Sequence, residues 1–160
     1  MNLFIFDTCP YTAAAMYCDS HVIKICLEAA QILCSVYWAN GIDAPYKLSH
    51  KNHPVCVFTR TSRGNFDWVC RHGLALCREY TARYNKTQKS QKVIEWCVQN
   101  ASLLKFDKTE QTPFALAMPD IYKKACPVES YRSYFREEKK HLHKWKMNKP
   151  SWINTVTEQT

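Results

Sequence analysis

Residues 21–36 read HVIKICLEAAQILCSV, and almost every position in this segment is apolar. The exceptions are His21, Lys24, Glu28, Gln31 and Ser35, whose spacing of three or four residues places them on one face of an α-helix. A helix that is apolar around most of its circumference is expected in the centre of a domain. Its polar stripe then faces either solvent or a cleft.

Two interpretations of this stripe remain open. In the first, the stripe is solvated and holds a Lys24–Glu28 ion pair worth a few tenths of a kcal/mol. In the second, it lines a cleft in which Glu28 and His21 act as acid/base groups and Lys24 as an amine nucleophile or phosphate ligand. The apolar helix would supply the desolvation that moves pKa values toward neutrality. Asp19, just before this face, joins the candidate catalytic residues.

Outward from this segment the pattern predicts further helices and few other elements. The expected order is a short extended arm or strand over residues 3–6, helices over 11–39, from Pro54, 65–84 and 89–102, an irregular stretch over 105–124, and a last helix over 127–147. Asn40–Gly41 is the expected stop of the first helix, and Asn52 the expected cap of the second. We therefore predict an all-α, compact single-domain helical bundle over residues 1–153 with a polar tail over 154–160.

Composition supports one folded domain and excludes several classes of site. The chain has 160 residues, of which 46% are hydrophobic and 13% aromatic, so it can bury a core. Only three glycines occur, which argues against a turn-rich sandwich or barrel. Neither GxGxxG nor GxxxxGK[ST] is present, so the standard nucleotide-binding loops are absent.

The nine cysteines indicate an intracellular protein more than a disulfide scaffold. Their number is odd, the opening MNLFIFD lacks the features of a secretory leader, and five cysteines fall within apolar helical patterns (Cys26, Cys34, Cys70, Cys77 and Cys97). We expect a reducing compartment, which for a viral protein is the host cytoplasm or nucleus. No uninterrupted apolar run of about 18 residues occurs, so no membrane partner is expected.

Two short motifs carry ligand types that zinc accepts. They are Cys18-x-x-His21 and His50-x-x-His53-x-x-Cys56. No CxxC pair accompanies them, and the HxE and PCxxC signature of zinc deaminases is missing. We predict no metal and no cofactor, and zinc at these residues stays an alternative.

The net charge of +8 points to a polyanionic partner. Basic residues concentrate in a middle cluster and in a C-terminal cluster that is interleaved with aromatic residues. The candidate nucleic-acid-binding residues are Lys47, His50, Lys51, His53, Arg60, Arg63, Lys140, Lys144 and Trp145. Aromatic rings in the second cluster either stack on unpaired bases or belong to the core.

The chain closes with Lys149-Pro150-Ser151-Trp152-Ile153 after a basic helical segment. Together with the short N-terminal arm, the apolar first helix and the basic proline-containing loop, this ending resembles the small all-helical pyrimidine-dimer DNA glycosylases of bacteriophages and related uncharacterised viral proteins. The resemblance implies cleavage of a glycosidic bond by an amine nucleophile through a Schiff base, with a carboxylate from the first helix assisting. Here Asp19 or Glu28 would be that carboxylate.

The nucleophile implied by the resemblance is an α-amino group, exposed in the family by removal of the initiator methionine before a small residue. This chain has Asn2 at that position, and Cys18-Asp19-Ser20-His21 where the family has an Arg-Glu pair. Lys24 or the N-terminal amine would therefore be the nucleophile.

The sequence thus predicts a nucleic-acid-processing enzyme, similar to a DNA glycosylase/AP-lyase, that acts on a damaged or modified pyrimidine. Two alternatives stay open: a non-catalytic viral nucleic-acid-binding protein, and a viral factor that binds a host protein or an anionic nucleotide.

Overall fold

The structure, a computed structural model, describes residues 1–154, and these residues form an all-α fold with no strand among them. The predicted tail therefore lies, apart from Asn154, outside the described residues. The α-helices are α1 (Pro10–Ala15), α2 (Asp19–Ala39), α3 (Pro54–Thr61), α4 (Arg63–Tyr84), α5 (Gln91–Gln99) and α6 (Pro127–Glu138). Four short 3₁₀ turns complete the described chain: η1 (Ala101–Leu103), η2 (Asp120–Tyr122), η3 (Lys140–Leu142) and η4 (Ser151–Asn154).

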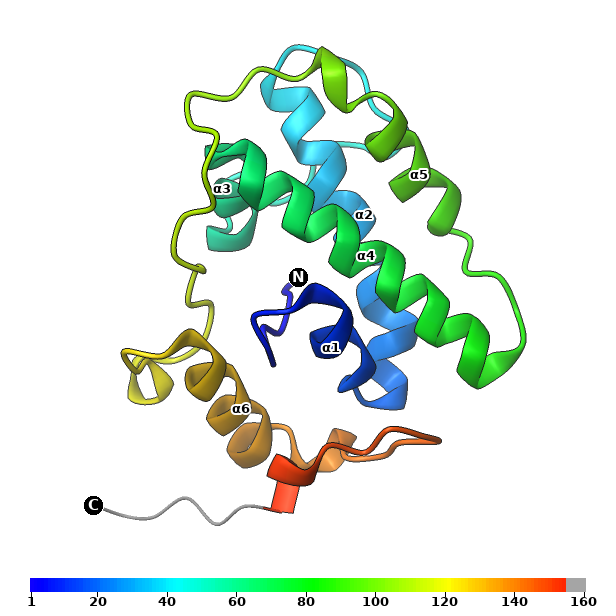
Figure 1. The fold of residues 1–160 in the computed structure, drawn as a ribbon, viewed down its shortest axis with the longest axis vertical. Coiled ribbons are helices and arrows are strands. Elements are labelled where there is room, and N and C mark those ends of the chain that lie inside the picture. Colours follow the sequence, from blue (N-terminus) through cyan, green and yellow to red (C-terminus); the bar gives the residue numbers. More distant parts are fainter. Residues whose placement is uncertain (155–160) are drawn as a thin grey trace.

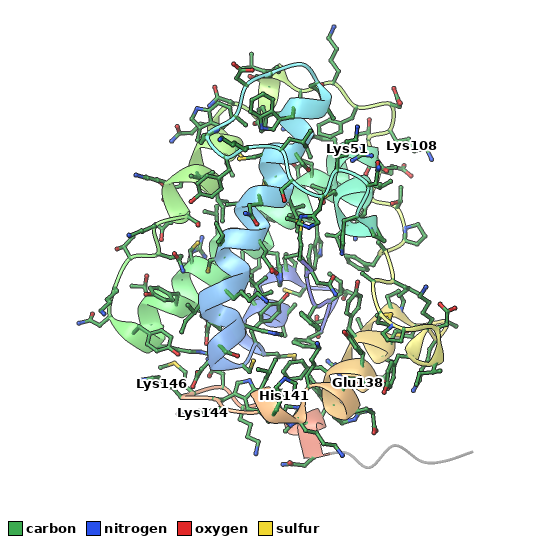
Figure 2. The ribbon with its side chains drawn as sticks, turned by 180° about the vertical axis from the view of Figure 1, so that it is seen from behind. Lys51, Lys108, Glu138, His141, Lys144 and Lys146 are labelled. Carbon is green, nitrogen blue, oxygen red and sulfur yellow. The ribbon has the colours of Figure 1, made fainter. Side chains whose placement is uncertain are left out.

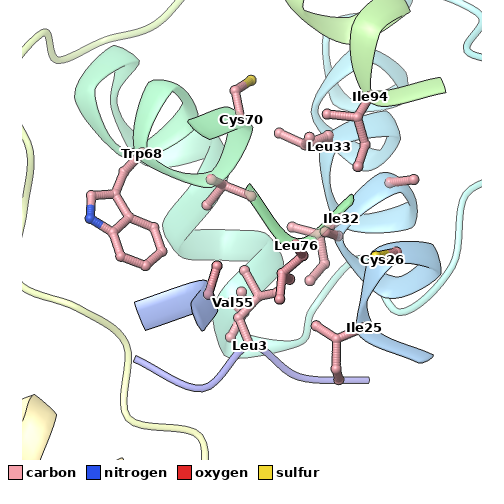
Figure 3. Packing of buried hydrophobic residues seen from close by; sticks show 14 of the residues in the cluster. Leu3, Ile25, Cys26, Ile32, Leu33, Val55, Trp68, Cys70, Leu76 and Ile94 are labelled. Carbon is pink, nitrogen blue, oxygen red and sulfur yellow. The ribbon is translucent and has the colours of Figure 1, made fainter. Parts of the chain in front are cut away.

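Helix α2 is the central helix, as its apolar sequence predicts. It packs against α3, α4 and α5, while α1 packs against α4 (Figure 1). Side chains of α2 such as Ile25, Ile32 and Leu33 meet Leu76 of α4 and Ile94 of α5 in the core (Figure 3). By length and composition α2 alone, among the described residues, could cross a membrane, but 67% of its most apolar window is buried inside the structure.

The first residues form an extended arm and not a strand. Leu3, Phe4, Ile5 and Phe6 are all buried, and the arm runs through the middle of the molecule between α2 and α6 (Figure 1). Their side chains join one hydrophobic cluster that extends to Ile153 near the other end of the chain. The arm is thus part of the core, so the position of its first residue is tied to the packing of the whole domain.

The single helix predicted over residues 11–39 is wrong, because the chain breaks between α1 and α2. Arg83 of α4 donates hydrogen bonds to the carbonyl oxygens of Ala15 and Tyr17, at 3.2 and 2.7 Å, and to Asp19 Oδ1 at 3.1 Å. A buried guanidinium therefore satisfies the backbone at the break. The apolar pattern continues across residues 13–18 and gives no sign of it.

The last helix is shorter than predicted, since α6 ends at Glu138 and not near Met147. The chain after it pairs with the start of α2. The Lys144 carbonyl accepts from the Asp19 amide at 2.8 Å, and the Lys146 amide donates to Asp19 Oδ1 at 3.0 Å. These bonds use backbone groups that a continued helix would have needed internally.

Other predicted boundaries agree more closely with the structure. Gly41, with φ of +72°, follows the end of α2 as expected for a glycine stop. Pro54 opens α3, but the cap is His53, whose Nδ1 accepts from the Val55 amide at 3.1 Å, and not Asn52. Ser62 caps α4 by accepting from the Asn65 amide at 3.0 Å.

Candidate functional site

A cavity of about 490 Å³ lies against the side of α2 that carries His21, Lys24 and Glu28. Its walls come from the N-terminal arm, α2, the start of α3, the segment before η2, and α6. We call it the Glu28 pocket, and its lining residues are Met1, Asn2, Phe4, His21, Lys24, Ile25, Glu28, His53, Pro54, Leu116, Ala117, Met118, Lys123, Tyr134 and Lys139. Segments distant in sequence therefore converge on one recess.

The polar stripe of α2 divides between this pocket, the core and solvent. Glu28 and His21 are buried at the pocket and Ser35 is buried in the core, whereas Lys24 is exposed. The cleft interpretation of the stripe therefore describes His21, Lys24 and Glu28. The expectation that the apolar positions are buried fails at two of them: Ile23 and Leu27 are 45% and 43% exposed.

Glu28 is the centre of the pocket's charge. Its carboxylate lies 3.6 Å from the α-amino nitrogen of Met1 and 3.9 Å from Lys24 Nζ. The other carboxylate oxygen accepts a hydrogen bond from the Asn2 backbone nitrogen at 3.1 Å. The Met1 and Glu28 side chains are only 3% and 10% exposed, whereas that of Lys24 is 68% exposed. One buried carboxylate thus lies beside two amines, one on the partly buried first residue and one on an exposed lysine.

The arm that carries the Met1 amine is fixed by buried hydrogen bonds. The Phe4 amide donates to the Tyr17 hydroxyl at 2.7 Å, and this hydroxyl lies 2.8 Å from His72 Nε2. His72 Nδ1 lies 3.0 Å from the Pro10 carbonyl oxygen, so it is the protonated ring nitrogen and Nε2 is the acceptor. The network positions the arm from α4 and from the break between α1 and α2.

Asn2 is fixed from the opposite wall. Its side-chain Nδ2 donates to the Ala117 carbonyl at 2.9 Å, and its Oδ1 accepts from the Leu3 amide at 2.8 Å. Asn2 therefore connects the arm to the segment before η2. The sequence offered no sign of this role for Asn2, because the contact joins residues 115 positions apart.

His21 is a buried imidazole stacked on Phe4, with ring centroids 4.8 Å apart. Burial, together with the positive charges of Lys24, Lys139 and His141, lowers the pKa of His21 to about 4. His21 is consequently neutral at pH 7. Its Nδ1 has no hydrogen-bond partner within residues 1–154, so a neutral ring with unused hydrogen-bonding capacity lies in the pocket wall.

Asp19 does not belong to the site, which corrects its place among the candidate catalytic residues. Its carboxylate is buried against Arg83 at 3.1 Å and accepts from the Lys146 amide at 3.0 Å. It does not line the Glu28 pocket. Its role is to join the start of α2 to α4 and to the C-terminal segment, which leaves Glu28 as the carboxylate of the pocket.

Most of the residues expected to bind nucleic acid lie between Lys47 and Arg60 or beyond the end of α6. His53 lines the pocket, and Lys47, His50 and Lys51 are exposed in the loop that leads to it, with Arg60 bonded to the Lys51 carbonyl. Lys140 and Lys144 are exposed beyond the end of α6. Lys51 and Lys144 mark opposite ends of the face that α2 presents in Figure 2.

Two of the predicted binding residues have other roles. Arg63 pairs with Asp67 at 3.1 Å and lines a separate hollow beside α4 and η1. The Trp145 indole donates to the Met16 carbonyl at 3.0 Å and packs edge-on against Phe135, with ring centroids 6.2 Å apart. Both side chains therefore stabilise the fold, and neither lines the Glu28 pocket.

The proposed zinc ligands do not converge. No group of three or more His, Cys, Asp or Glu side chains within residues 1–154 is arranged to hold a metal ion. Cys18 contacts Ser20, Cys56 contacts the Met1 sulfur at 3.8 Å, and His53 caps α3. All nine cysteines, which lie within the described residues, are unpaired, and the five predicted to be apolar core residues are buried.

The sequence pattern did not predict that α6 and the segment before it help to line the Glu28 pocket. Tyr134 and Lys139 line the pocket, with Lys139 Nζ 5.4 Å from the centre of the Tyr134 ring. Lys123 lines it as well. The basic, aromatic character of residues 122–145 was the available signal, but it could not show which rings face the pocket. No family model, curated protein or solved structure matches this chain.

Proposed function

We propose that the Glu28 pocket is the active site of a DNA glycosylase/AP-lyase that acts on a damaged or modified pyrimidine. The observation that carries the proposal is the carboxylate of Glu28, which is buried and lies 3.6 Å from the Met1 α-amino nitrogen and 3.9 Å from Lys24 Nζ. An amine beside a desolvated carboxylate is the pair that Schiff-base chemistry at a sugar requires. The resemblance to phage pyrimidine-dimer glycosylases implies the same pair.

The reaction uses the amine as nucleophile. The deprotonated amine attacks C1′ of the deoxyribose, the glycosidic C1′–N bond breaks, and the base leaves with its bonding electron pair and takes up a proton. Opening of the C1′–O4′ bond, with a proton delivered to O4′, then gives the Schiff base. Loss of a C2′ proton and rupture of the C3′–O3′ bond release the downstream strand with a phosphate at its 5′ end. Glu28 is placed to accept the proton that leaves the amine.

The α-amino group is the better nucleophile of the two amines. It belongs to Met1, a partly buried residue whose side chain is only 3% exposed, whereas the Lys24 side chain is 68% exposed. Removal of Met1 would turn the Asn2 nitrogen, 3.1 Å from the same carboxylate, into the amino terminus. The arrangement therefore keeps an α-amine at Glu28 with or without Met1.

The rest of the pocket suits a nucleotide turned out of a duplex. Phe4 and Tyr134 stack on each other with ring centroids 6.0 Å apart, and Tyr134 lines the pocket where a base could lie on it. Neutral His21 can donate to or accept from the edge of a base. Lys24, Lys123 and Lys139 surround the opening with positive charge for the flanking phosphates.

A non-catalytic nucleic-acid-binding protein is the second candidate. The exposed lysines at both ends of the α2 face (Figure 2) favour a polyanion in either case. A binding protein, however, does not need a buried carboxylate between two amines, because Glu28 offsets positive charge that would otherwise attract phosphates. The position of Glu28 therefore favours the enzyme.

The test is borohydride trapping on DNA that contains an abasic site and on ultraviolet-irradiated duplex. We expect a covalent adduct with the wild-type protein, and a loss of trapping rate of about 100-fold or more in Glu28→Gln. Glu110→Gln, an exposed residue outside the pocket, is the matched control and should trap at the wild-type rate. The absence of an adduct on both substrates, or an unchanged rate in Glu28→Gln, would refute the proposal.

A further inference from the structure

Ile121 is the most exposed large hydrophobic side chain within residues 1–154, at 79%. It belongs to η2, the short yellow turn at the start of the α6 region in Figure 1. A single exposed apolar residue is common on protein surfaces and needs no explanation by itself. The turn that presents Ile121 and the pocket beside it give this residue a specific setting.

The turn holds Ile121 in a fixed position. The Tyr122 amide donates to the Pro119 carbonyl at 3.0 Å, and the Lys123 amide donates to the Asp120 carbonyl at 3.1 Å. The Lys123 ammonium also pairs with the Asp120 carboxylate at 2.9 Å. These contacts close the turn on both sides of Ile121, so its side chain projects from a hydrogen-bonded turn.

The turn is also part of the pocket rim. Met118, three residues before Ile121, and Lys123, two residues after it, both line the Glu28 pocket. The Tyr122 ring lies 5.5 Å from the ring of Tyr134, which lines the pocket as well, and the Tyr122 hydroxyl donates to Glu138 at 2.8 Å. A nucleotide entering the pocket would therefore leave the duplex next to Ile121.

We propose that Ile121 is a wedge that enters the base stack of duplex DNA and occupies the space left by the nucleotide in the Glu28 pocket. This inference rests on the proposed function. Proteins that distort DNA insert isoleucine, leucine, phenylalanine or methionine between bases, and this buries apolar surface otherwise left in water. An exposed isoleucine on a hydrogen-bonded turn at the mouth of a nucleotide-sized pocket has the position and the chemistry for this role.

The surroundings of Ile121 favour nucleic acid over a protein partner. A protein-binding surface needs a contiguous apolar patch, whereas the exposed neighbours of Ile121 are Pro119, Asp120, Lys123 and Lys124. Two carboxylates lie beside the turn, and both have partners: Asp120 pairs with Lys123, and Glu138 accepts from the Tyr122 hydroxyl. A lone apolar tip flanked by lysines fits a gap between stacked bases.

The test separates insertion from chemistry by comparing duplex and single-stranded DNA. In a duplex with 2-aminopurine beside an abasic site, the wild-type protein should raise 2-aminopurine fluorescence, and Ile121→Ser should lose most of that rise. Borohydride trapping by Ile121→Ser should fall about tenfold or more on the duplex but less than about twofold on the single strand, where no stack has to be opened. Ile121→Leu should retain both signals. Leu103→Ser, which removes a 55% exposed leucine in η1 outside the pocket, is the matched control.

The wedge and the glycosylase chemistry fail under different results of these experiments. Equal losses on duplex and single strand, or no loss on either, would overturn the wedge while leaving the proposed function intact. A wild-type protein that perturbs 2-aminopurine but forms no adduct would refute the glycosylase chemistry, and the fluorescence of Ile121→Ser would still decide the wedge. A wild-type protein that does not perturb the duplex would overturn the wedge.

Discussion

Acidification from pH 7 to pH 5 should destabilise this protein through His21 and His72. Burial lowers the pKa of each imidazole from 6.5 to about 4, although the Pro10 carbonyl partly opposes the effect at His72. The unfolded chain therefore binds more protons than the folded chain between pH 6.5 and pH 4. Stability is present above pH 6.5 and is lost as the pH falls through this window. At pH 5 the loss is about 2 kcal/mol for each histidine, or about 4 kcal/mol together.

Urea unfolding at pH 7, 6 and 5, followed by far-ultraviolet circular dichroism, measures this loss as a fall in the free energy of unfolding. His21→Gln and His72→Gln should each remove about half of the pH dependence, whatever their stability at pH 7. His141→Gln changes an exposed histidine and is the control. A free energy of unfolding that is equal at pH 7 and pH 5, or a pH dependence as large in either variant as in the wild-type protein, would show that the two buried histidines do not cause the loss.

Three further predictions concern close contacts between distant segments of the chain. Tyr17→Phe removes the hydroxyl that accepts from the Phe4 amide and contacts His72. Urea unfolding should show a free energy of unfolding lower by roughly 2 kcal/mol, and trapping on abasic DNA should be slower. Arg83→Met leaves the buried Asp19 carboxylate unpaired and should cost about 3 kcal/mol or more by urea unfolding; a loss below 1 kcal/mol would contradict the buried pair. Gly64→Ala brings a Cβ to 2.6 Å from the Gln111 amide nitrogen, and should lower the midpoint of thermal unfolding through a loss of roughly 1–3 kcal/mol, whereas an unchanged midpoint would contradict the close approach.

The all-α class and the central place of α2 could be predicted because each helix shows its own local pattern of apolar residues. The apolar positions of residues 21–36 predict a buried helix, and Gly41 predicts its end. The break before α2 could not be predicted in this way. It depends on Arg83, which lies in a different helix and reaches the carbonyls of Ala15 and Tyr17 through the fold.

The residues of the Glu28 pocket also divide into those that the spacing within one helix predicts and those that depend on other segments. His21, Lys24 and Glu28 share one face of one helix, so their spacing alone places them together. Spacing could not assign the neighbour of Glu28, because the Met1 amine arrives on an arm fixed by Tyr17 and by contacts across the pocket. It also could not separate Asp19 from the site, because the partner of Asp19 comes from α4.

An amine beside Glu28 should react with DNA, and the position of the trapped adduct on the protein shows which amine reacts. The wild-type protein is reduced with borohydride on abasic DNA, digested, and analysed by mass spectrometry of the DNA-linked peptide. We expect the adduct on the α-amino group of the first residue. A short extension placed ahead of Met1 moves that amine away from Glu28 and should abolish the adduct, whereas Lys24→Met should retain it. An adduct on a lysine outside the Glu28 pocket, or full trapping by a variant that has both the extension and Lys24→Met, would contradict this expectation.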